Sequence, residues 1–156
     1  MPGTLKIKPI QANLIHDTAV FSKMDPYCKF SVGNQKAKSE VCKDGGTHPI
    51  WKKSIEIPLN IDQSKCLVEI RDENLLKDQN IGSCEIDISE VKNIGQVTKW
   101  YSLEFDNRKA GDILLELSYQ TGTISGKESA EWVENELARN RMEYEGGSPV
   151  FSARRA

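Results

Sequence analysis

Met24-Asp25-Pro26-Tyr27-Cys28-Lys29-Phe30 is the stretch from which the rest of the chain can be interpreted. Proline fixes its own φ and has no amide proton, so it can open a β-strand but cannot lie inside one. It also pushes the preceding Asp25 into an extended conformation. The aromatic and β-branched residues behind it predict a strand that ends at the turn pair Gly33-Asn34. An aspartate held at the rim of a sheet suits two roles, a ligand for a hard cation or the side chain of an Asx turn.

The size and charge of the chain exclude several classes of protein. Its 156 residues suffice for one domain and an accessory segment. The 21 Lys and Arg residues against 23 Asp and Glu give a net charge of −2, which argues against a dedicated nucleic-acid binder. The first ten residues lack the apolar stretch of a signal peptide, and no run approaches the roughly 20 apolar residues that span a bilayer. We therefore expect a cytoplasmic location.

The four cysteines, Cys28, Cys42, Cys66 and Cys84, show no metal-binding or redox spacing. In a chain without a secretory signal, they are expected to be reduced thiols that serve as small apolar side chains.

From Thr4 to about Tyr119 the sequence consists of short alternating segments. Leu5 and Ile7 alternate with Lys6 and Lys8, which predicts a strand with one basic, solvated face. The segment 35–42 is expected to form a hairpin with the strand after Pro26. About eight such segments, separated by turns and without a long helix, predict an all-β fold, an eight-stranded antiparallel Greek-key sandwich.

The composition changes after Tyr119, and we expect a domain over 1–120, a linker over 121–126, and a helical tail with an extended arm over 127–156. Ser125 and Glu128 have the spacing of a capping box, and Gly146-Gly147 would end the helix. Its apolar stripe is narrow, so the helix either packs on the sandwich or binds a partner. The second alternative would make the chain a scaffold subunit of a larger assembly.

The order of the motifs resembles that of the C2 domain, a calcium- and lipid-binding β-sandwich, over about Leu5 to Tyr119. The matching stretches are Ala12-Asn13-Leu14, Ser22-Lys23-Met24-Asp25-Pro26-Tyr27, His48-Pro49-Ile50-Trp51, Asn80-Ile81-Gly82 and Asp112-Ile113-Leu114-Leu115. Because the A-N-L strand comes first and the Gly111-Asp112 strand last, the resemblance implies the second circular permutation of the family.

The resemblance implies a calcium site built from about five aspartates in two loops, since Ca²⁺ takes 6 to 8 oxygen ligands. In the first loop, Ala19 stands six residues before Asp25, where the family has a carboxylate; Asp17 could replace it only if the loop bends differently. In the second loop, Gln79 stands where another aspartate is expected. The remaining ligand set is Asp25, Asp72, Asn74 and Asp78. Two lost carboxylates would weaken calcium binding by roughly 10² to 10⁵ fold.

Two further surfaces follow from the resemblance. Lysines on the family's basic face contact anionic lipid headgroups, and the corresponding residues are Lys29, Lys36, Lys38, Lys52 and Lys53. The apolar pairs Val20-Phe21 and Leu75-Leu76 lie at the tips of the ligand loops, where they would insert into a membrane or cover the end of the sandwich.

Catalysis finds no support in the sequence. His16 and His48 are the only histidines, and no nucleophile elbow, P-loop or zinc-protease motif is present. The sequence thus predicts a non-enzymatic docking module for anionic phospholipid membranes, a protein partner or both, with a reduced calcium site. The alternatives are the scaffold subunit and a calcium-dependent phospholipid-binding protein.

Overall fold

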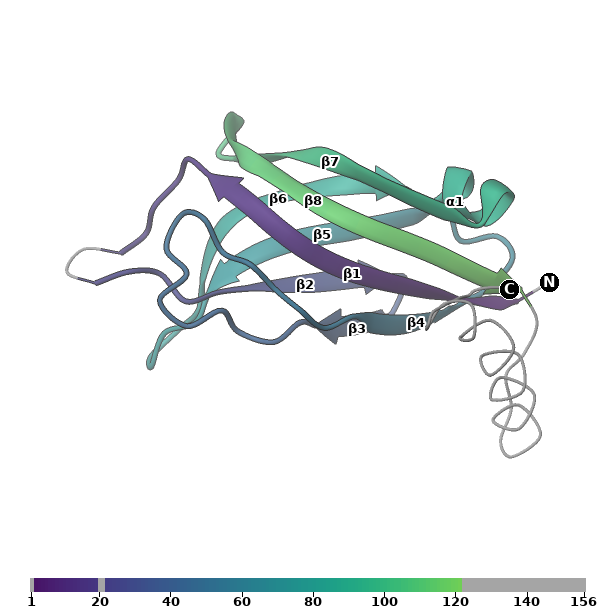
Figure 1. The fold of residues 1–156 in the computed structure, drawn as a ribbon, viewed down its shortest axis with the longest axis horizontal. Helices are drawn as coiled ribbons and strands as arrows, with labels where there is room; N and C mark the ends of the chain where they lie inside the picture. The colour runs from purple at the N-terminus through teal and green to yellow at the C-terminus, as the bar shows by residue number, and fades with distance from the viewer. Residues whose placement is uncertain (1, 20–21, 122–156) are drawn as a thin grey trace, which may run out of the picture. The chain divides into compact units, whose positions relative to one another are not determined.

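The computed structural model describes residues 2–19 and 22–121, which form eight strands and one short helix (Figure 1). The expected tail helix and arm, and Val20 and Phe21, lie outside these residues. The elements are β1 (Gly3–Leu14), β2 (Pro26–Val32), β3 (Gln35–Lys38), β4 (Ile55–Leu59), β5 (Lys65–Asp72), β6 (Gln79–Asp87), α1 (Ser89–Ile94), β7 (Gln96–Phe105) and β8 (Arg108–Thr121). In these residues no helix is long and apolar enough to cross a membrane.

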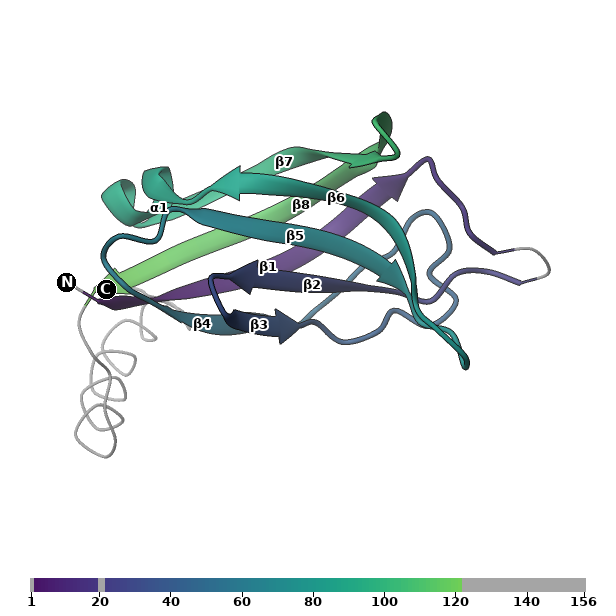
Figure 2. The same cartoon turned by 180° about the vertical axis from the view of Figure 1, so that it is seen from behind.

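The strands are antiparallel and follow the order β3-β2-β5-β6-β7-β8-β1-β4. The single pair Ser83–Glu104 joins β6 to β7, so the structure consists of two four-stranded layers. Figure 1 shows the layer of β1 and β8 in front, and Figure 2, from behind, shows the layer of β2, β5 and β6 in front. This arrangement confirms the eight-stranded antiparallel sandwich.

The alternation of the strands sets which side chains form the core between the layers. In β1, Leu5 and Ile7 are fully buried, whereas Lys6 and Lys8 are exposed. The same period of two places every second residue of β2 and β5 inside. The largest fully buried side chains include Trp51, Phe30, Leu5, Ile7, Met24 and Ile57. Burial of this apolar surface is the main favourable term in folding.

The β2–β3 hairpin has the expected turn, with Gly33 at φ 58°. However, β3 ends at Lys38 and does not continue to residue 42. The hydroxyl of Ser39 accepts a hydrogen bond of 2.8 Å from the amide of Cys28 and thereby replaces the next carbonyl of the ladder. The chain then leaves the sheet into the long connection to β4.

The helix α1 was not foreseen from the sequence, because it has only six residues. Before it, Asp87 Oδ1 accepts a hydrogen bond of 2.8 Å from the Ser89 amide. After it, Gly95 adopts φ 94° and its amide donates to the carbonyl of Val91 at 2.8 Å. Val91 is buried and attaches the helix to the core.

All four cysteines are free thiols, and Cys28 and Cys66 are buried in the core. Burial raises the pKa of Cys66 to about 12 and that of Cys84 to about 11. These thiols are therefore neutral at physiological pH and serve as apolar packing groups.

We expect Gly111→Ala to destabilise the sandwich more than Gly95→Ala. At Gly111 (φ 143°) an added Cβ would lie 2.3 Å from the carbonyl oxygen of Asn13 on β1. At Gly95 (φ 94°) nothing lies within 4 Å of the added carbon. Both changes strain the backbone, and the clash should add about 2 kcal/mol to the loss at Gly111. Equal losses in denaturant unfolding would show that β1 moves freely away from β8.

Candidate functional site: the loop end of the sandwich

Three connections meet at one end of the sandwich, at the left in Figure 1; their described residues are 15–19 with 22–25, then 39–54, then 73–78. Their meeting follows from the register, because Pro26 at the start of β2 pairs with Asp72 at the end of β5. The acidic residues that the sequence singled out therefore come from neighbouring loops.

Asp72 is the one charged residue that is buried in the described part of the chain, with 4% of its surface exposed. Its Oδ1 accepts a hydrogen bond from the Asp25 amide at 2.8 Å, and its Oδ2 accepts one from Thr18 Oγ1 at 2.7 Å. A buried carboxylate is costly unless it is hydrogen-bonded, and here both oxygens have protein donors. Asp72 thus attaches the first loop to the end of β5.

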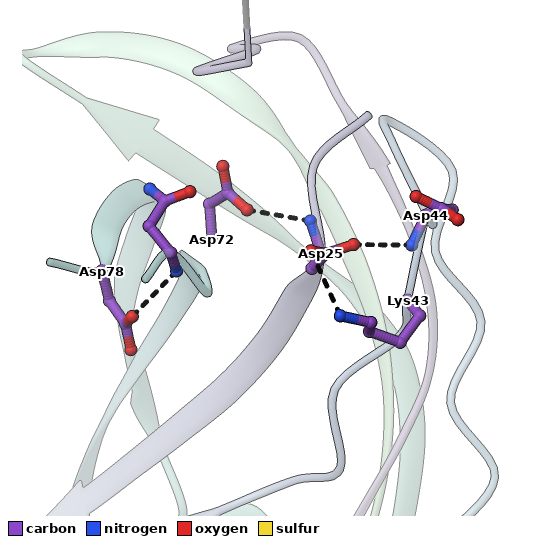
Figure 3. A network of polar contacts seen from close by, with 6 residues as sticks. Asp25, Lys43, Asp44, Asp72 and Asp78 are labelled. Carbon is purple, nitrogen blue, oxygen red and sulfur yellow. Dashed lines mark hydrogen bonds and ion pairs between the residues drawn. The ribbon is translucent and has the colours of Figure 1, made fainter. Parts of the chain in front are cut away.

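The side chain of Asp25 turns toward the 39–54 connection (Figure 3). Its Oδ1 accepts a hydrogen bond of 2.7 Å from the amide of Asp44, and its Oδ2 lies 3.8 Å from Lys43 Nζ. Neither contact involves Asp72 or Asp78. The Asp25 side chain therefore attaches the start of β2 to the 39–54 connection, and this long-range bond to Asp44 is not the local bond of an Asx turn.

Asp78 lies apart from the other two carboxylates (Figure 3). Its Oδ2 accepts a hydrogen bond of 2.6 Å from the Tyr27 hydroxyl, and its Oδ1 accepts one of 3.1 Å from the Asn74 amide. These two bonds, first that from Tyr27, lower the pKa of Asp78 below its ordinary value of 3.8. Burial and the same contact with Asp78 raise the pKa of Tyr27.

The residues present do not fit a bound calcium ion. The oxygens of Asp25, Asp72 and Asp78 accept hydrogen bonds from the chain itself, and Asp17 Oδ1 accepts one of 3.0 Å from the Ala19 amide. Among residues 2–19 and 22–121, no three His, Cys, Asp or Glu side chains gather so that they could hold a metal. A calcium site needs these oxygens to converge on one point.

A cavity of about 550 Å³ opens beside Asp78. The ring of His16 stacks on Phe105 along one wall, with centroids 4.0 Å apart, and His16 Nδ1 lies 3.0 Å from the carbonyl of Ile81. Arg71, Lys77 and Asn80 line other parts. The cavity lies beside the acidic residues and contains two cations.

The loop between β5 and β6 exposes its apolar tip completely. Leu75 and Leu76 are fully solvent-accessible, with relative exposures of 104% and 99%. They cover nothing within the described residues. The other expected tip, Val20-Phe21, lies outside those residues.

Three of the predicted lysines share the outer face of the β2 layer. Lys29 on β2 pairs directly with Lys38 on β3, and Lys36 pairs with Ser31 one step along. The ammonium of Lys38 lies 5.5 Å from the centre of the Tyr27 ring. In the described part of the chain, none of these three lysines forms an ion pair with a carboxylate within 4 Å; Glu69, opposite Lys29, contacts Arg71 at 3.8 Å.

The other two predicted lysines lie elsewhere. These are Lys52 and Lys53. The backbone amides of both donate to Glu40 Oε2, at 2.8 Å from Lys52 and 3.2 Å from Lys53. The side chain of Lys52 lines a hollow together with Lys6 and Lys8 of β1, on the outer face of the other layer. The five lysines therefore belong to more than one surface.

Sequence reasoning missed several partners of these residues. The Thr18 hydroxyl donates to Asp72, and the Asp44 backbone amide donates to Asp25. No sequence pattern indicates either hydrogen bond. Tyr27 and Arg71 could have been found, because Tyr27 shares the face of Lys29 two residues away and Arg71 pairs with Tyr27 across the strands.

The fold and the loop end define the chain as an antiparallel β-sandwich module with acidic loops at one end. A family model of the C2 domain matches residues 3–103. The chain belongs to the C2 domain family.

Two known proteins illustrate the relationship. Extended synaptotagmin-2-A of Xenopus laevis is 34% identical over 103 residues, which cover 65% of this chain but only 12% of that protein. The 16 kDa phloem protein 2 of Arabidopsis thaliana is 25% identical over 120 residues, which cover 76% of this chain and 82% of that protein. The chain thus spans a small part of the extended synaptotagmins that it matches.

Solved structures agree with this assignment. The calcium-bound pair of C2 domains of Extended-Synaptotagmin 2 matches with a TM-score of 0.66 and 28% identity, over 85% of this chain and 51% of that one. A C2 domain of plant Extended Synaptotagmin 1 has a TM-score of 0.67 at 16% identity, over 78% of this chain and 96% of that one. The second likeness shows the fold alone.

Tyr27→Phe should raise the pKa of Asp78 toward 3.8, because the ionised carboxylate loses its strongest donor. In the wild type the lowered pKa contributes stability that is present above the ordinary value and is lost as the pH falls through the folded-state pKa. The variant should therefore lose part of this pH dependence on the acid side. Carboxyl-carbon NMR shifts of Asp78 against pH measure the change.

Tyr101→Phe is the matched control, because Tyr101 lies on β7 and makes no contact with Asp78. Its Asp78 titration should equal that of the wild type. An unchanged Asp78 pKa in Tyr27→Phe would mean that the Tyr27 hydroxyl does not stabilise the carboxylate.

Proposed function

We propose that the chain is a non-enzymatic docking module that binds anionic membrane lipids through the lysine face, defined as Lys29, Lys36 and Lys38, without a requirement for calcium. The observation that carries this proposal is the direct pairing of Lys29 with Lys38. Like charges opposite one another destabilise a sheet. A layer of anionic headgroups would remove that repulsion, so the folded face favours such a ligand.

The surroundings of the lysine face include further groups that favour a positive surface, beside the carboxylates of Glu69 and Asp78. The Tyr27 ring beneath Lys38 offers a platform for cation–π attraction. Arg71 adds a half-buried cation next to Tyr27 in the register. Basic residues near an anionic membrane contribute about 1 kcal/mol each, so this group supports weak, salt-sensitive binding. Because the cytoplasmic leaflet carries the anionic lipids, such binding would hold the protein peripherally on that leaflet.

The state of the loop end supports independence from calcium. The acidic side chains are occupied by protein donors, so a cation would have to displace the hydrogen bonds of Thr18, Tyr27 and three backbone amides. The exposed Leu75 and Leu76 lie in the same region and provide apolar area that can enter the headgroup layer. A role of residues 127–156 in binding a protein partner stays a prediction, because they lie outside the described residues.

Full-length protein should sediment with phosphatidylserine-containing vesicles at low salt, and Lys36→Gln/Lys38→Gln should weaken this binding roughly thirtyfold. The loss of two basic residues corresponds to about 2 kcal/mol. Binding should also fall as salt shortens the Debye length from about 30 Å at 0.01 M to about 8 Å at 0.15 M.

Lys99→Gln/Lys109→Gln is the matched control with the same change of net charge. These lysines lie on the other layer and pair with Glu90 and Asp112. The control should sediment nearly as the wild type does. Equal losses in both variants, or no sedimentation of the wild type at low salt, would contradict the proposal.

Calcium titration by calorimetry should show no saturable binding at micromolar concentrations. Ala19→Asp/Gln79→Asp restores two carboxylates at the family's positions and should strengthen binding by roughly 10² to 10⁵ fold. Ala19→Asn/Gln79→Asn is the neutral control and should resemble the wild type. A wild-type affinity in the micromolar range would show that the hydrogen-bonded carboxylates rearrange around the ion.

A further inference from the structure

The outer face of the β4-β1-β8 layer contains a hollow of about 260 Å³, which we name the β1 hollow. It lies on the layer that does not carry the lysine face. Its lining consists of three cations, two hydroxyls and one carboxylate: Lys6, Lys8, Lys52, Ser54, Ser118 and Glu116.

The register explains why these groups meet. Lys6 and Lys8 lie two residues apart on the exposed side of β1, so both point away from the core. Across the β1–β8 pairing, Lys6 stands opposite Ser118 and Lys8 stands opposite Glu116. Lys52 and Ser54 come from the segment just before β4, which pairs with β1 on its other side.

The carboxylates near the hollow do not neutralise its lysines. Glu116 Oε2 accepts a hydrogen bond of 3.0 Å from Gln96 Nε2 on β7, away from β1. Glu40 accepts a hydrogen bond from the backbone amide of Lys52, and its carboxylate forms no ion pair with the Lys52 ammonium. Glu56 stands opposite Lys6 in the register, but its carboxylate lies farther than 4 Å from the Lys6 ammonium. Within the described residues, none of the three hollow lysines has an ion-pair partner.

We propose that the β1 hollow binds a compact anion that carries several phosphate charges. Lysine ammonium groups act as point charges for phosphate, and each offers three donors. The hydroxyls of Ser54 and Ser118 can donate to further phosphate oxygens. A ligand with a single carboxylate would leave most of these donors without an acceptor. A ligand with two or more phosphates can contact the three lysines together. Such binding would relieve the repulsion between Lys6 and Lys8.

Two exposed apolar side chains, Trp100 and Ile50, lie near the hollow and help to decide whether the phosphate belongs to a lipid or to a free ligand. Trp100 on β7 pairs with Leu114 on β8, one step from the row of Glu116 and Lys8. At the far side of the same row, Gln11 bridges to Ile50. Trp100 is 45% exposed and Ile50 is 60% exposed. A phosphate borne by a lipid would bring these side chains to the membrane interface, whereas a free phosphate ligand would leave them in water.

The test uses full-length protein and two soluble probes, pyrophosphate and inositol trisphosphate, at about 0.15 M salt, where distant charges are screened. Amide NMR shifts should move saturably at Lys6, Lys8, Ser54 and Ser118. Lys6→Gln/Lys8→Gln should weaken binding at the hollow by roughly a hundredfold, because each lysine lost removes a charge-assisted hydrogen bond that contributes about tenfold. Lys36→Gln/Lys38→Gln, with the same charge change on the other layer, should leave it unchanged.

Ser118→Ala is the second variant, because it keeps the charge and removes one donor; it should weaken binding severalfold. Wild-type far-ultraviolet circular dichroism in all variants shows that they fold. The proposal would be overturned if the amide shifts did not saturate with either probe. It would also be overturned if Lys6→Gln/Lys8→Gln and Lys36→Gln/Lys38→Gln reduced the shifts equally, because that result would show only nonspecific counterion attraction. Neither result depends on sedimentation with phosphatidylserine vesicles, so this proposal and the lysine-face proposal fail separately.

Vesicles that contain phosphatidylinositol bisphosphate distinguish the two sources of phosphate. If the ligand is a lipid headgroup, Trp100→Ala should weaken vesicle binding while the affinity for soluble inositol trisphosphate stays unchanged. If the ligand is free in solution, Trp100→Ala should change neither, and inositol trisphosphate should still saturate the hollow. Either result supports a phosphate site at the β1 hollow.

Discussion

The buried carboxylate of Asp72 is the constraint on which the loop end depends. It closes β5, lies opposite Pro26, and holds the loop before β2 through the amide of Asp25 and the hydroxyl of Thr18. An unpaired buried charge would be strongly destabilising, so these two donors hold the described ends of the loop before β2 against the end of β5. The side chain of Asp25 is consequently free to turn outward to Asp44 and Lys43.

In this arrangement the acidic side chains accept hydrogen bonds that the chain supplies itself. In a calcium site, mutual repulsion of carboxylates is relieved by the ion between them. Here the three aspartates are separated, and each is neutralised or solvated by its own neighbours (Figure 3). The lysine face and the β1 hollow lie on the outer faces of the two layers, and Lys38 of the lysine face reaches the acidic loops through Tyr27.

Much of the fold could be predicted from the sequence, because burial with a period of two is a local property. The strand after Pro26, the Gly33 turn and the alternation of Leu5 and Ile7 with Lys6 and Lys8 all appear as expected. The end of β3 and the helix α1 could not be predicted, since they depend on hydrogen bonds of Ser39 and Asp87. At the site, the sequence indicated which neighbouring loops carry the acidic residues, but the direction of each carboxylate depends on donors distant in sequence. The separation of Lys52 from Lys36 likewise follows from the path of the 39–54 connection.

The pairing of β1 with β8 has a consequence for how the protein is made. Gly3 pairs with Thr121 and Leu14 with Gly111, so the first strand of the sandwich needs the last one as its neighbour. Contacts of such long sequence separation slow folding, because the loop entropy is lost before the contacts form. During synthesis, β1 has no β8 to pair with until nearly the whole domain has left the ribosome. Its Leu5 and Ile7 must stay out of aggregates until then, and the intervening Lys6 and Lys8 interrupt that apolar stretch with charge.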